Sequence, residues 1–360
     1  MRSQGKKMIK FGLIGCGTHA VAAVIPAMEK VAGLELAAVC DISADRLGQV
    51  KYSRGSPQRY TDYRKMLDAE QLDAVYIATN CAFHCDLAVL ALKSGRHAVT
   101  EKPMAMSADE CRRMLAAAQA AGKTLVVDFE SRYKETSRVI RKWTVEEKRL
   151  GAVHAVHIDH FWDGHKASGN LAARRAAFLE ASGSLDCGIH KLDLARYFTG
   201  GGSWTRIHAA GAWFGEKARF APHISIQAAL DCGTLVTLNN SFAYTAYIGR
   251  RAIYGSTIVA GTKGVIEESF DNATHRESVR IVSDTLEETI TERAAGGHGN
   301  HISMMLSDLC GSLASGAPLP PTIATGEDGL MAQVIADEAN RQALEEGDVC
   351  QLRAARAPGA

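Results

Sequence analysis

Short apolar segments alternate with helix-forming segments through the first third of the chain, and no other feature restricts the fold as much. The apolar segments cover residues 10–14, 34–40, 74–79, 97–100 and 124–128. Near-continuous apolar strands separated by helices are typical of a parallel sheet whose two faces are both covered. The pattern therefore predicts an α/β domain with a doubly wound parallel sheet in residues 1–128.

A glycine turn, Gly15-x-Gly17-x-x-Ala20, directly follows the first strand and opens a helix. The first glycine permits a tight turn, the second lets the backbone approach a pyrophosphate, and the small alanine allows close helix–strand packing. Backbone N–H groups of residues 16–19 are expected to face an anion at the positive end of the helix. This context predicts a Rossmann domain that binds a dinucleotide through Gly15, Cys16, Gly17, Thr18 and His19.

An acidic residue, Asp41, ends the second strand about two dozen residues beyond Gly17. This is the position that reads the adenosine ribose in such domains. A carboxylate there accepts hydrogen bonds from a 2′-hydroxyl and repels a 2′-phosphate, so the expected cofactor is NAD. Arg46 lies nearby, and NADP therefore stays possible.

The apolar pattern changes after about residue 129, where segments begin to alternate between apolar and polar residues. Strands are expected at residues 153–161, 207–214, 224–231, 235–242, 257–260, 265–268 and 279–282, and helices at 136–150, 302–314 and 327–344. These elements predict a C-terminal α+β domain, residues 129–352, with a large, mostly antiparallel open sheet. Residues 353–360 are expected to form a flexible tail.

The composition argues against several functional classes. The 360 residues include 41 Lys and Arg against 40 Asp and Glu, so no net charge attracts nucleic acid or an anionic membrane. No apolar run reaches the about 20 residues that a membrane helix needs. A secretory signal is not expected either, and nine scattered cysteines favour reduced thiols in the cytoplasm. Cys81 and Cys85 flank His84, but no second ligand pair follows at zinc spacing, so no metal is expected.

Two further segments carry ionisable groups suited to chemistry on an alcohol. Glu101-Lys102-Pro103 follows the strand at residues 97–100, which would deliver the lysine to the ligand crevice. If residues from about 185 onward are helical, Asp186, His190 and Asp193 share one face at i, i+4 and i+7. An imidazole is a natural proton acceptor near neutral pH. From these residues alone, a solvated helix face remains the alternative.

In combination the motifs resemble the glucose-fructose oxidoreductase / inositol dehydrogenase / MocA (Gfo/Idh/MocA) family. The matching residues are Gly15-Cys16-Gly17, Asp41, Ile77-Ala78-Thr79 with His84, Glu101-Lys102-Pro103, Phe129 with Arg132, the segment 186–193, Gly261-Thr262-Lys263-Gly264 and Gly326-Glu327-Asp328-Gly329. They occur in order over nearly the whole chain. The chain departs from the family at Thr79-Asn80-Cys81, where the family usually has Thr-Pro-Asn, and at Ser182-Gly183-Ser184, where it has a glycine cluster. Glu130 stands where Asn is common.

The resemblance implies an NAD(P)-dependent oxidoreductase that transfers hydride between nicotinamide and a secondary alcohol of a sugar, sugar derivative or cyclitol. It implies that Lys102, Asp186 and His190 form the catalytic set. In this hypothesis His190 takes the hydroxyl proton, Lys102 stabilises the alkoxide, and Asp186 binds a neighbouring hydroxyl. Thr79, His84, Glu101 and Lys102 are expected at the cofactor.

The substrate pocket is less well specified by the sequence. The expected substrate-binding residues are Lys102, Arg132, Trp162, Arg175, Asp186 and His190. For Trp162 and Arg175, which we expect in a loop before the catalytic helix, a solvated loop is the alternative. The expected partner is a small sugar or polyol, with no nucleic acid and no membrane.

Family members of other function keep two alternatives open. One is an NAD-dependent glycosidase of the same fold, and the other is a non-catalytic NAD-binding regulator. The family's open sheet often forms the oligomer interface, so a homodimer or homotetramer is expected.

Overall fold

The computed structural model describes residues 7–161, 170–181, 183, 185–243, 254–271, 276–293 and 298–349. The chain divides into an N-terminal unit (residues 1–134 and 295–330) and a C-terminal unit (residues 135–294 and 331–360). The division expected from the sequence, at residue 128, differs from this because it assigns residues 295–330 to the second domain. The expected tail, 353–360, lies outside the described residues.

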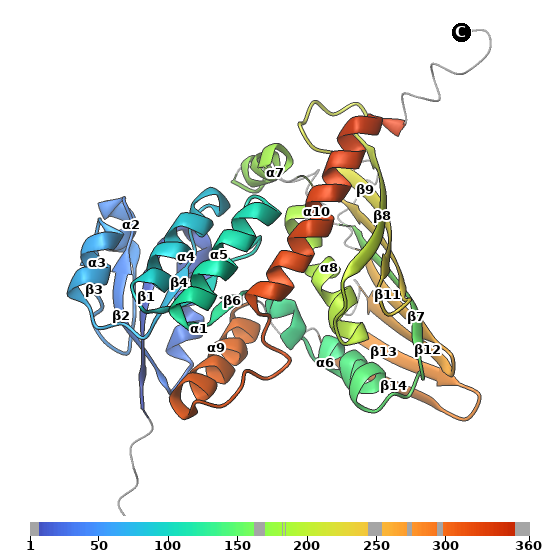
Figure 1. Cartoon of the computed structure of the whole chain (residues 1–360), viewed down its shortest axis with the longest axis horizontal. Helices are drawn as coiled ribbons and strands as arrows, with labels where there is room; N and C mark the ends of the chain where they lie inside the picture. The colour runs from blue at the N-terminus through green and yellow to red at the C-terminus, as the bar shows by residue number, and fades with distance from the viewer. Residues whose placement is uncertain are drawn as a thin grey trace, which may run out of the picture. The chain divides into compact units, whose positions relative to one another are not determined.

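The N-terminal unit is built on a six-stranded parallel sheet with the order β3-β2-β1-β4-β5-β6 (Figure 1). Its strands are β1 (Ile9–Ile14), β2 (Leu34–Cys40), β3 (Gln58–Tyr60), β4 (Ala74–Ile77), β5 (His97–Thr100) and β6 (Leu125–Val127). The doubly wound parallel sheet predicted from the sequence is confirmed. The edge strand β3 was not predicted, because its three residues are not buried and carry no apolar run.

Helices cover both faces of this sheet. They are α1 (Ile25–Glu29), α2 (Ala44–Gln49), α3 (Tyr63–Ala69), α4 (His84–Lys93), α5 (Ala108–Ala121) and α9 (His298–Ser315). Ile9, Phe11 and Leu13 of β1 point toward one face and join a hydrophobic cluster with α1 and α9. The helices α4 and α5 pack together on the other face. Because Ile302, Met305, Leu306 and Leu309 of α9 enter the first cluster, residues 295–330 belong with this unit.

The helix after the glycine turn is not regular. A π-helical turn, Ala20–Val24, precedes α1, and Pro26 lies at the start of α1. Proline has no N–H to donate inside a helix and clashes with the preceding turn. The wider turn before Pro26 accommodates this interruption.

The C-terminal unit contains an eight-stranded sheet with the order β14-β13-β12-β11-β7-β10-β9-β8. Its strands are β7 (Val153–Phe161), β8 (Trp204–Ala212), β9 (His223–Leu230), β10 (Leu235–Ser241), β11 (Tyr254–Gly261), β12 (Gly264–Asp271), β13 (Arg276–Ser283) and β14 (Glu287–Arg293). The neighbouring strands pair antiparallel except β7 with β10. The mostly antiparallel open sheet is therefore confirmed.

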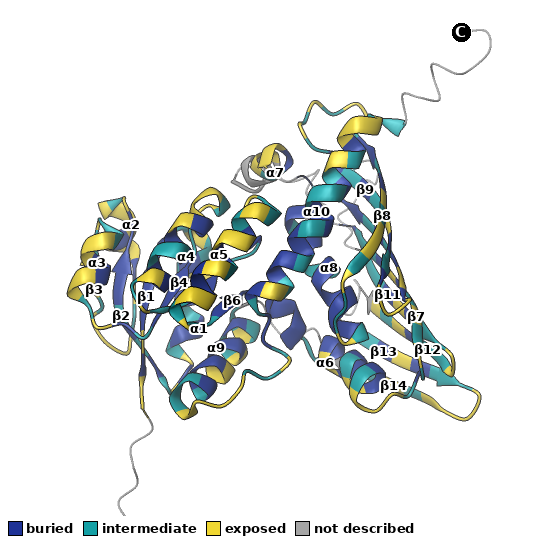
Figure 2. Ribbon diagram, viewed as in Figure 1, coloured by how far each residue is buried: buried dark blue, intermediate teal, exposed yellow. Residues whose placement is uncertain are grey.

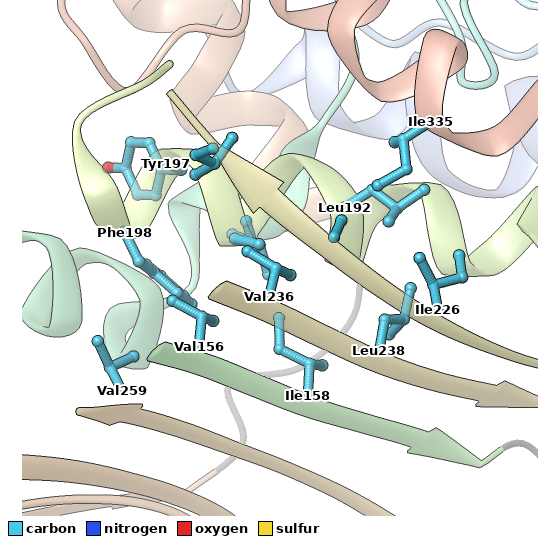
Figure 3. Close-up of a cluster of buried hydrophobic side chains, with 14 of the residues drawn as sticks. Val156, Ile158, Leu192, Tyr197, Phe198, Ile226, Val236, Leu238, Val259 and Ile335 are labelled. Carbon is cyan, nitrogen blue, oxygen red and sulfur yellow. The ribbon is translucent and has the colours of Figure 1, made fainter. Parts of the chain in front are cut away.

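One face of this sheet carries the core of the unit. The helices α6 (Glu135–Arg141), α8 (Leu185–Thr199) and α10 (Gly326–Glu346) lie along it. Figure 3 shows Leu192 of α8 and Ile335 of α10 above Val156, Ile158 and Leu238 of the sheet. Burying side chains of this size stabilises the fold by about 1.5–3 kcal/mol each. In Figure 2, α8 is mostly buried, whereas α5 of the N-terminal unit combines buried with exposed residues.

The helix α7 (Asn170–Ala181) occupies a segment that we expected to be a loop. Seven of its twelve residues are Ala or Leu, both strong helix formers, which explains the helix. No helix of the described residues is long and apolar enough to cross a membrane.

Candidate active site

The glycine turn after β1 requires glycine at its first position. Gly15 has a φ of +97°, and a Cβ there would lie 2.6 Å from the carbonyl oxygen of Ala78. Its N–H donates to Cys40 O at 2.8 Å, which ties the turn to the end of β2. At Gly17, a Cβ would meet no atom of the described residues within 4 Å. The second glycine therefore relieves no clash and leaves open space beside the turn, where a ligand can approach the backbone.

Asp41 lies beside this turn, and its two carboxylate oxygens accept backbone N–H groups. Oδ2 accepts from Cys16 N at 2.8 Å, and Oδ1 accepts from Ser43 N at 2.9 Å. The expectation that the N–H of Cys16 faces an anionic ligand is therefore corrected, because Asp41 occupies that donor. Arg46 Nη1 lies 3.8 Å from Asp41 Oδ2, which places a cation close to the predicted ribose position.

The thiol of Cys16 does not supply a charge here. Burial, followed by the negative charge of Asp41, raises the pKa of Cys16 to about 12. The side chain therefore stays neutral near pH 7.

Two exposed apolar side chains at the same edge of the sheet were not predicted. Ile42, directly after Asp41, is 89 % exposed, and Phe83, in the short helix Cys81–Phe83, is 61 % exposed. Both residues follow the carboxyl ends of parallel strands, the edge at which open α/β sheets bind ligands. The sequence feature that could have indicated Ile42 is an isoleucine directly after the acidic residue that ends the second strand.

His84 joins two loops of the predicted cofactor site. It is 1 % exposed, and its Nδ1 and Nε2 lie 2.9 Å from Pro103 O and 3.2 Å from Thr79 O. The imidazole therefore holds the loop after β4 against the loop after β5. The sequence predicted His84 as a cofactor residue, and these contacts give it a supporting position behind Thr79.

Glu101 connects the loop after β5 to the glycine turn. Its Oε1 lies 3.0 Å from His19 Nε2 and accepts a hydrogen bond from the Tyr76 hydroxyl at 2.9 Å. Burial raises the pKa of Glu101, but the hydrogen bonds from His19 and Tyr76 and the charges of His19 and Lys102 outweigh it and lower that pKa below its usual value. Glu101 is therefore ionised, and Lys102 follows it directly. The sequence did not indicate Tyr76 as a site residue, because it lies in an apolar strand whose side chains are all expected to pack in the core.

Arg132 occupies a buried position behind this site. Its Nη2 lies 3.2 Å from Asp328 Oδ1, and its Nη1 donates to Pro321 O at 3.3 Å and Ile323 O at 3.4 Å. These contacts fasten the segment before α10 to the short helix Glu130–Tyr133. Substrate binding by Arg132 stays a prediction, and the described contacts are structural.

The helix α8 carries the other two predicted catalytic residues. It begins at Leu185, as expected, and Asp186 is buried while His190 is half-buried. Gly183 precedes it with a φ of +69°, and a Cβ there would lie 2.8 Å from Phe220 Cβ. The Asp186 N–H donates to Gly183 O at 3.2 Å, which defines the first turn of the helix.

Close packing against the sheet positions this helix. A Cβ on Gly188 would lie 2.8 Å from Asn240 Cγ on β10. Asn240 is fully buried, and its Oδ1 lies 2.6 Å from His160 Nδ1 on β7. Gly188, two residues from both Asp186 and His190, thus lets α8 approach the sheet closely.

The remaining predicted substrate residues are not described in full. Trp162 lies outside the described residues, and Arg175 lies in α7 with its side chain outside them. The described His, Cys, Asp and Glu residues form no group of three or more that could hold a metal ion.

The residues of the N-terminal unit fit a dinucleotide. The open space at Gly17, the carboxylate of Asp41 and the ionised Glu101 lie along one edge of the parallel sheet. A backbone turn at a helix start suits a pyrophosphate, and carboxylates suit ribose hydroxyls.

Comparison with known proteins agrees with this fit. A model of an oxidoreductase family with an NAD-binding Rossmann fold matches residues 9–129, and a GFO/IDH/MocA C-terminal domain model matches residues 140–267. The chain is 29 % identical over 273 residues to a D-apiose dehydrogenase of Paraburkholderia graminis, covering 74 % of this chain and 68 % of the relative. It is 25 % identical over 320 residues to a myo-inositol 2-dehydrogenase of Thermotoga maritima, covering 86 % and 89 %.

Solved structures share the fold. An oxidoreductase from Agrobacterium radiobacter in complex with NAD⁺, L-tartaric acid and magnesium has a TM-score of 0.79 at 20 % identity, covering 96 % of this chain and 100 % of that one. A levoglucosan dehydrogenase in complex with NADH and levoglucosan has a TM-score of 0.77 at 20 % identity, covering 95 % and 98 %. Because the two family models match successive parts of the sequence, this chain belongs to the Gfo/Idh/MocA family of NAD-binding oxidoreductases.

Proposed function

We propose that the chain is an NAD(P)-dependent dehydrogenase that acts on a secondary alcohol of a sugar, sugar derivative or cyclitol. The observation that carries this proposal is the contact between His19 of the glycine turn and Glu101, which directly precedes Lys102. It holds the loop bearing the lysine against the turn suited to a pyrophosphate. A cation fixed there can stabilise the charge that develops on an alcohol oxygen during oxidation.

The chemical roles follow from the groups that each unit offers. The nicotinamide cofactor, when bound, supplies the hydride acceptor. His190 accepts the proton of the substrate hydroxyl as a general base. Lys102 stabilises the oxygen that loses this proton, and Asp186 binds a neighbouring hydroxyl and so orients the substrate.

The residues of the N-terminal unit hold and orient the cofactor. The turn at Gly15 and Gly17, with Thr18 and His19, receives the pyrophosphate, while Glu101 accepts a hydrogen bond from a ribose hydroxyl. Asp41 reads the other ribose and favours NAD. The nearby guanidinium of Arg46 can meet a 2′-phosphate, so we propose a preference for NAD with some use of NADP.

The substrate class is supported by the relatives. Those described above include a D-apiose dehydrogenase and a myo-inositol 2-dehydrogenase, which act on a sugar and a cyclitol. Trp162, Arg132 and Arg175 remain proposed contributors to substrate binding.

One assay tests the reaction and its rivals. Purified protein is incubated with NAD or NADP and a panel of inositols, aldoses, sugar acids and sugar phosphates, and absorbance of the reduced cofactor is followed. Sustained reduction with one of these polyols supports the proposal. Glycoside cleavage without net reduction would indicate a glycosidase instead, and cofactor binding without turnover on any of them would indicate a regulator.

A further inference from the structure

A buried chain of polar side chains lies behind the cofactor edge of the parallel sheet. Tyr76 of β4 contacts both Glu101, which follows β5, and Asp128, which follows β6. Tyr76 is 0 % exposed and Asp128 is 2 % exposed. The strands β4, β5 and β6 are neighbours, and their register sets Glu101 and Asp128 side by side, one pleat beyond Tyr76.

The geometry of Tyr76, Glu101 and Asp128 restricts how many protons these three side chains can share. A tyrosine hydroxyl has one proton to donate, yet the Tyr76 oxygen lies within hydrogen-bond distance of two carboxyl groups. If both carboxyls were ionised, one of the two contacts would set lone pairs against each other inside the protein. One carboxyl must therefore carry a proton and donate it to the tyrosine oxygen.

The surrounding charges decide which carboxyl holds that proton. Glu101 faces His19 and is followed by Lys102, whereas Asp128 faces Glu101 and Glu130. Burial, followed by the charges of Glu101 and Glu130, raises the pKa of Asp128 well above its usual value. The proton therefore belongs to Asp128, which donates to Tyr76, and Tyr76 donates in turn to Glu101.

We propose that Asp128 is a neutral carboxylic acid that acts, through Tyr76, as a positioning residue for Glu101 in the cofactor site. Both described contacts of Glu101 fall on Oε1, so its other oxygen is oriented without being used by either. An Oε2 held in this way can accept a hydrogen bond from a ribose hydroxyl. This last step rests on the proposed function.

The hydrogen bonds from Asp128 through Tyr76 position Glu101 and do not relay protons. Among the described residues, Asp128 Oδ1 has no hydrogen-bond partner. A proton that reached Asp128 from the site would have no onward donor or acceptor there. The buried acid therefore fixes the direction of the two hydrogen bonds.

The first test measures the proton without using activity. Folding constants of the wild type and Asp128→Asn are compared by urea unfolding between pH 5 and pH 8, followed by circular dichroism. An unfolded aspartate ionises near pH 3.9, whereas Asp128 keeps its proton in the fold, so wild-type stability is lost as pH rises above that value. The ratio of the variant to the wild-type folding constant should rise with pH, by up to about tenfold per pH unit, until pH reaches the raised pKa of Asp128. A ratio independent of pH would overturn the proposal.

The second test measures positioning by NADH binding. Asp128→Asn keeps a donor for Tyr76, so its affinity should stay within about twofold of the wild type. Asp128→Leu and Tyr76→Phe remove a donor from the chain and should each weaken NADH binding by about tenfold. Unchanged affinity in both would overturn the positioning role, and Tyr76→Phe alone decides the matter if Asp128→Leu does not fold.

The two tests separate this inference from the proposed function. If the wild type bound no NADH, the proposed function would fail, while the pH dependence of folding would still report the proton on Asp128. If the wild type binds NADH but the folding ratio does not change with pH, the inference fails and the proposed function stands.

Discussion

His19 Nε2 lies 3.0 Å from Glu101 Oε1, and this contact joins the glycine turn after β1 to the loop after β5. The two residues are distant in sequence, and each carries a separate part of the proposed site. Their contact makes the charge of one loop depend on the other.

Replacing His19 should therefore change the pH dependence of cofactor binding. The pKa of Glu101 is lowered in the fold. Its carboxylate therefore stays ionised through the usual carboxyl range and is protonated only when pH falls through the lowered pKa. His19→Ala removes one cause of that lowering, and NADH affinity should begin to fall at a higher pH. Fluorescence titration from pH 4.5 to 8 measures this. His19→Gln keeps one hydrogen-bond donor, so its NADH affinity should begin to fall at a pH between those of the wild type and His19→Ala. If the affinity of all three proteins falls at the same pH, the prediction is wrong.

Alanine substitutions at the two glycines of the turn should affect different properties, the stability of the fold at Gly15 and the binding of NADH at Gly17. Gly15→Ala forces a positive φ on alanine and brings its Cβ against Ala78 O, so it should destabilise the fold by at least about 1–3 kcal/mol. Gly17→Ala meets no described atom within 4 Å and should leave the thermal midpoint almost unchanged while weakening NADH binding. Thermal unfolding and NADH titration of both variants measure the contrast. Equal loss of stability in the two would argue against the ligand space at Gly17.

The close approach of α8 to β10 should depend on Gly188. Alanine normally stabilises a helix interior by about 0.5–1 kcal/mol relative to glycine. At Gly188 the new Cβ would lie 2.8 Å from Asn240 Cγ, so overpacking should outweigh that gain and cost about 1–3 kcal/mol. Gly311→Ala, in α9 with no described atom within 4 Å, is the matched control and should be stabilising. Thermal unfolding distinguishes the two signs.

The proposed catalytic groups should affect turnover more than binding. His190→Asn removes the general base and should lower kcat by about 10²–10⁴-fold. Lys102→Met should also lower kcat, because the developing oxygen charge loses its cation. His208→Asn, at an exposed histidine of β8, is the control and should leave kcat unchanged. Turnover of either test variant within about threefold of the wild type would rule out its assigned role.

A substitution of Arg132 can distinguish a role in stabilising the fold from a role in binding substrate. Arg132→Met removes the cation beside Asp328 Oδ1 and the donor to two carbonyl groups, and should destabilise the fold by about 1–3 kcal/mol. Arg112→Met, which removes an exposed i,i+3 pair with Asp109, should cost less than about 0.5 kcal/mol. A raised substrate KM with an unchanged thermal midpoint in Arg132→Met would instead favour substrate binding.

Local sequence patterns predicted much of this protein. The apolar strands and the glycine turn indicated the doubly wound sheet. The spacing of Asp186 and His190 placed them on one face of a helix, on the condition that the segment is helical. These features depend on periodicity and turn chemistry within a few residues. The short strand β3 and the helix α7 escaped because neither has an amphipathic pattern, although the composition of α7 favours a helix.

Tertiary structure decided which polar groups meet. Nothing in the sequence indicates that Asp41 takes the N–H of Cys16, or that Tyr76 stands between Glu101 and Asp128. Hydrogen bonds of this kind join residues on different strands, and their direction depends on burial and on neighbouring charges that only the folded chain brings together. The sequence therefore determined the kind of fold and the chemical groups available, and the packing of neighbouring strands determined their partners and charges.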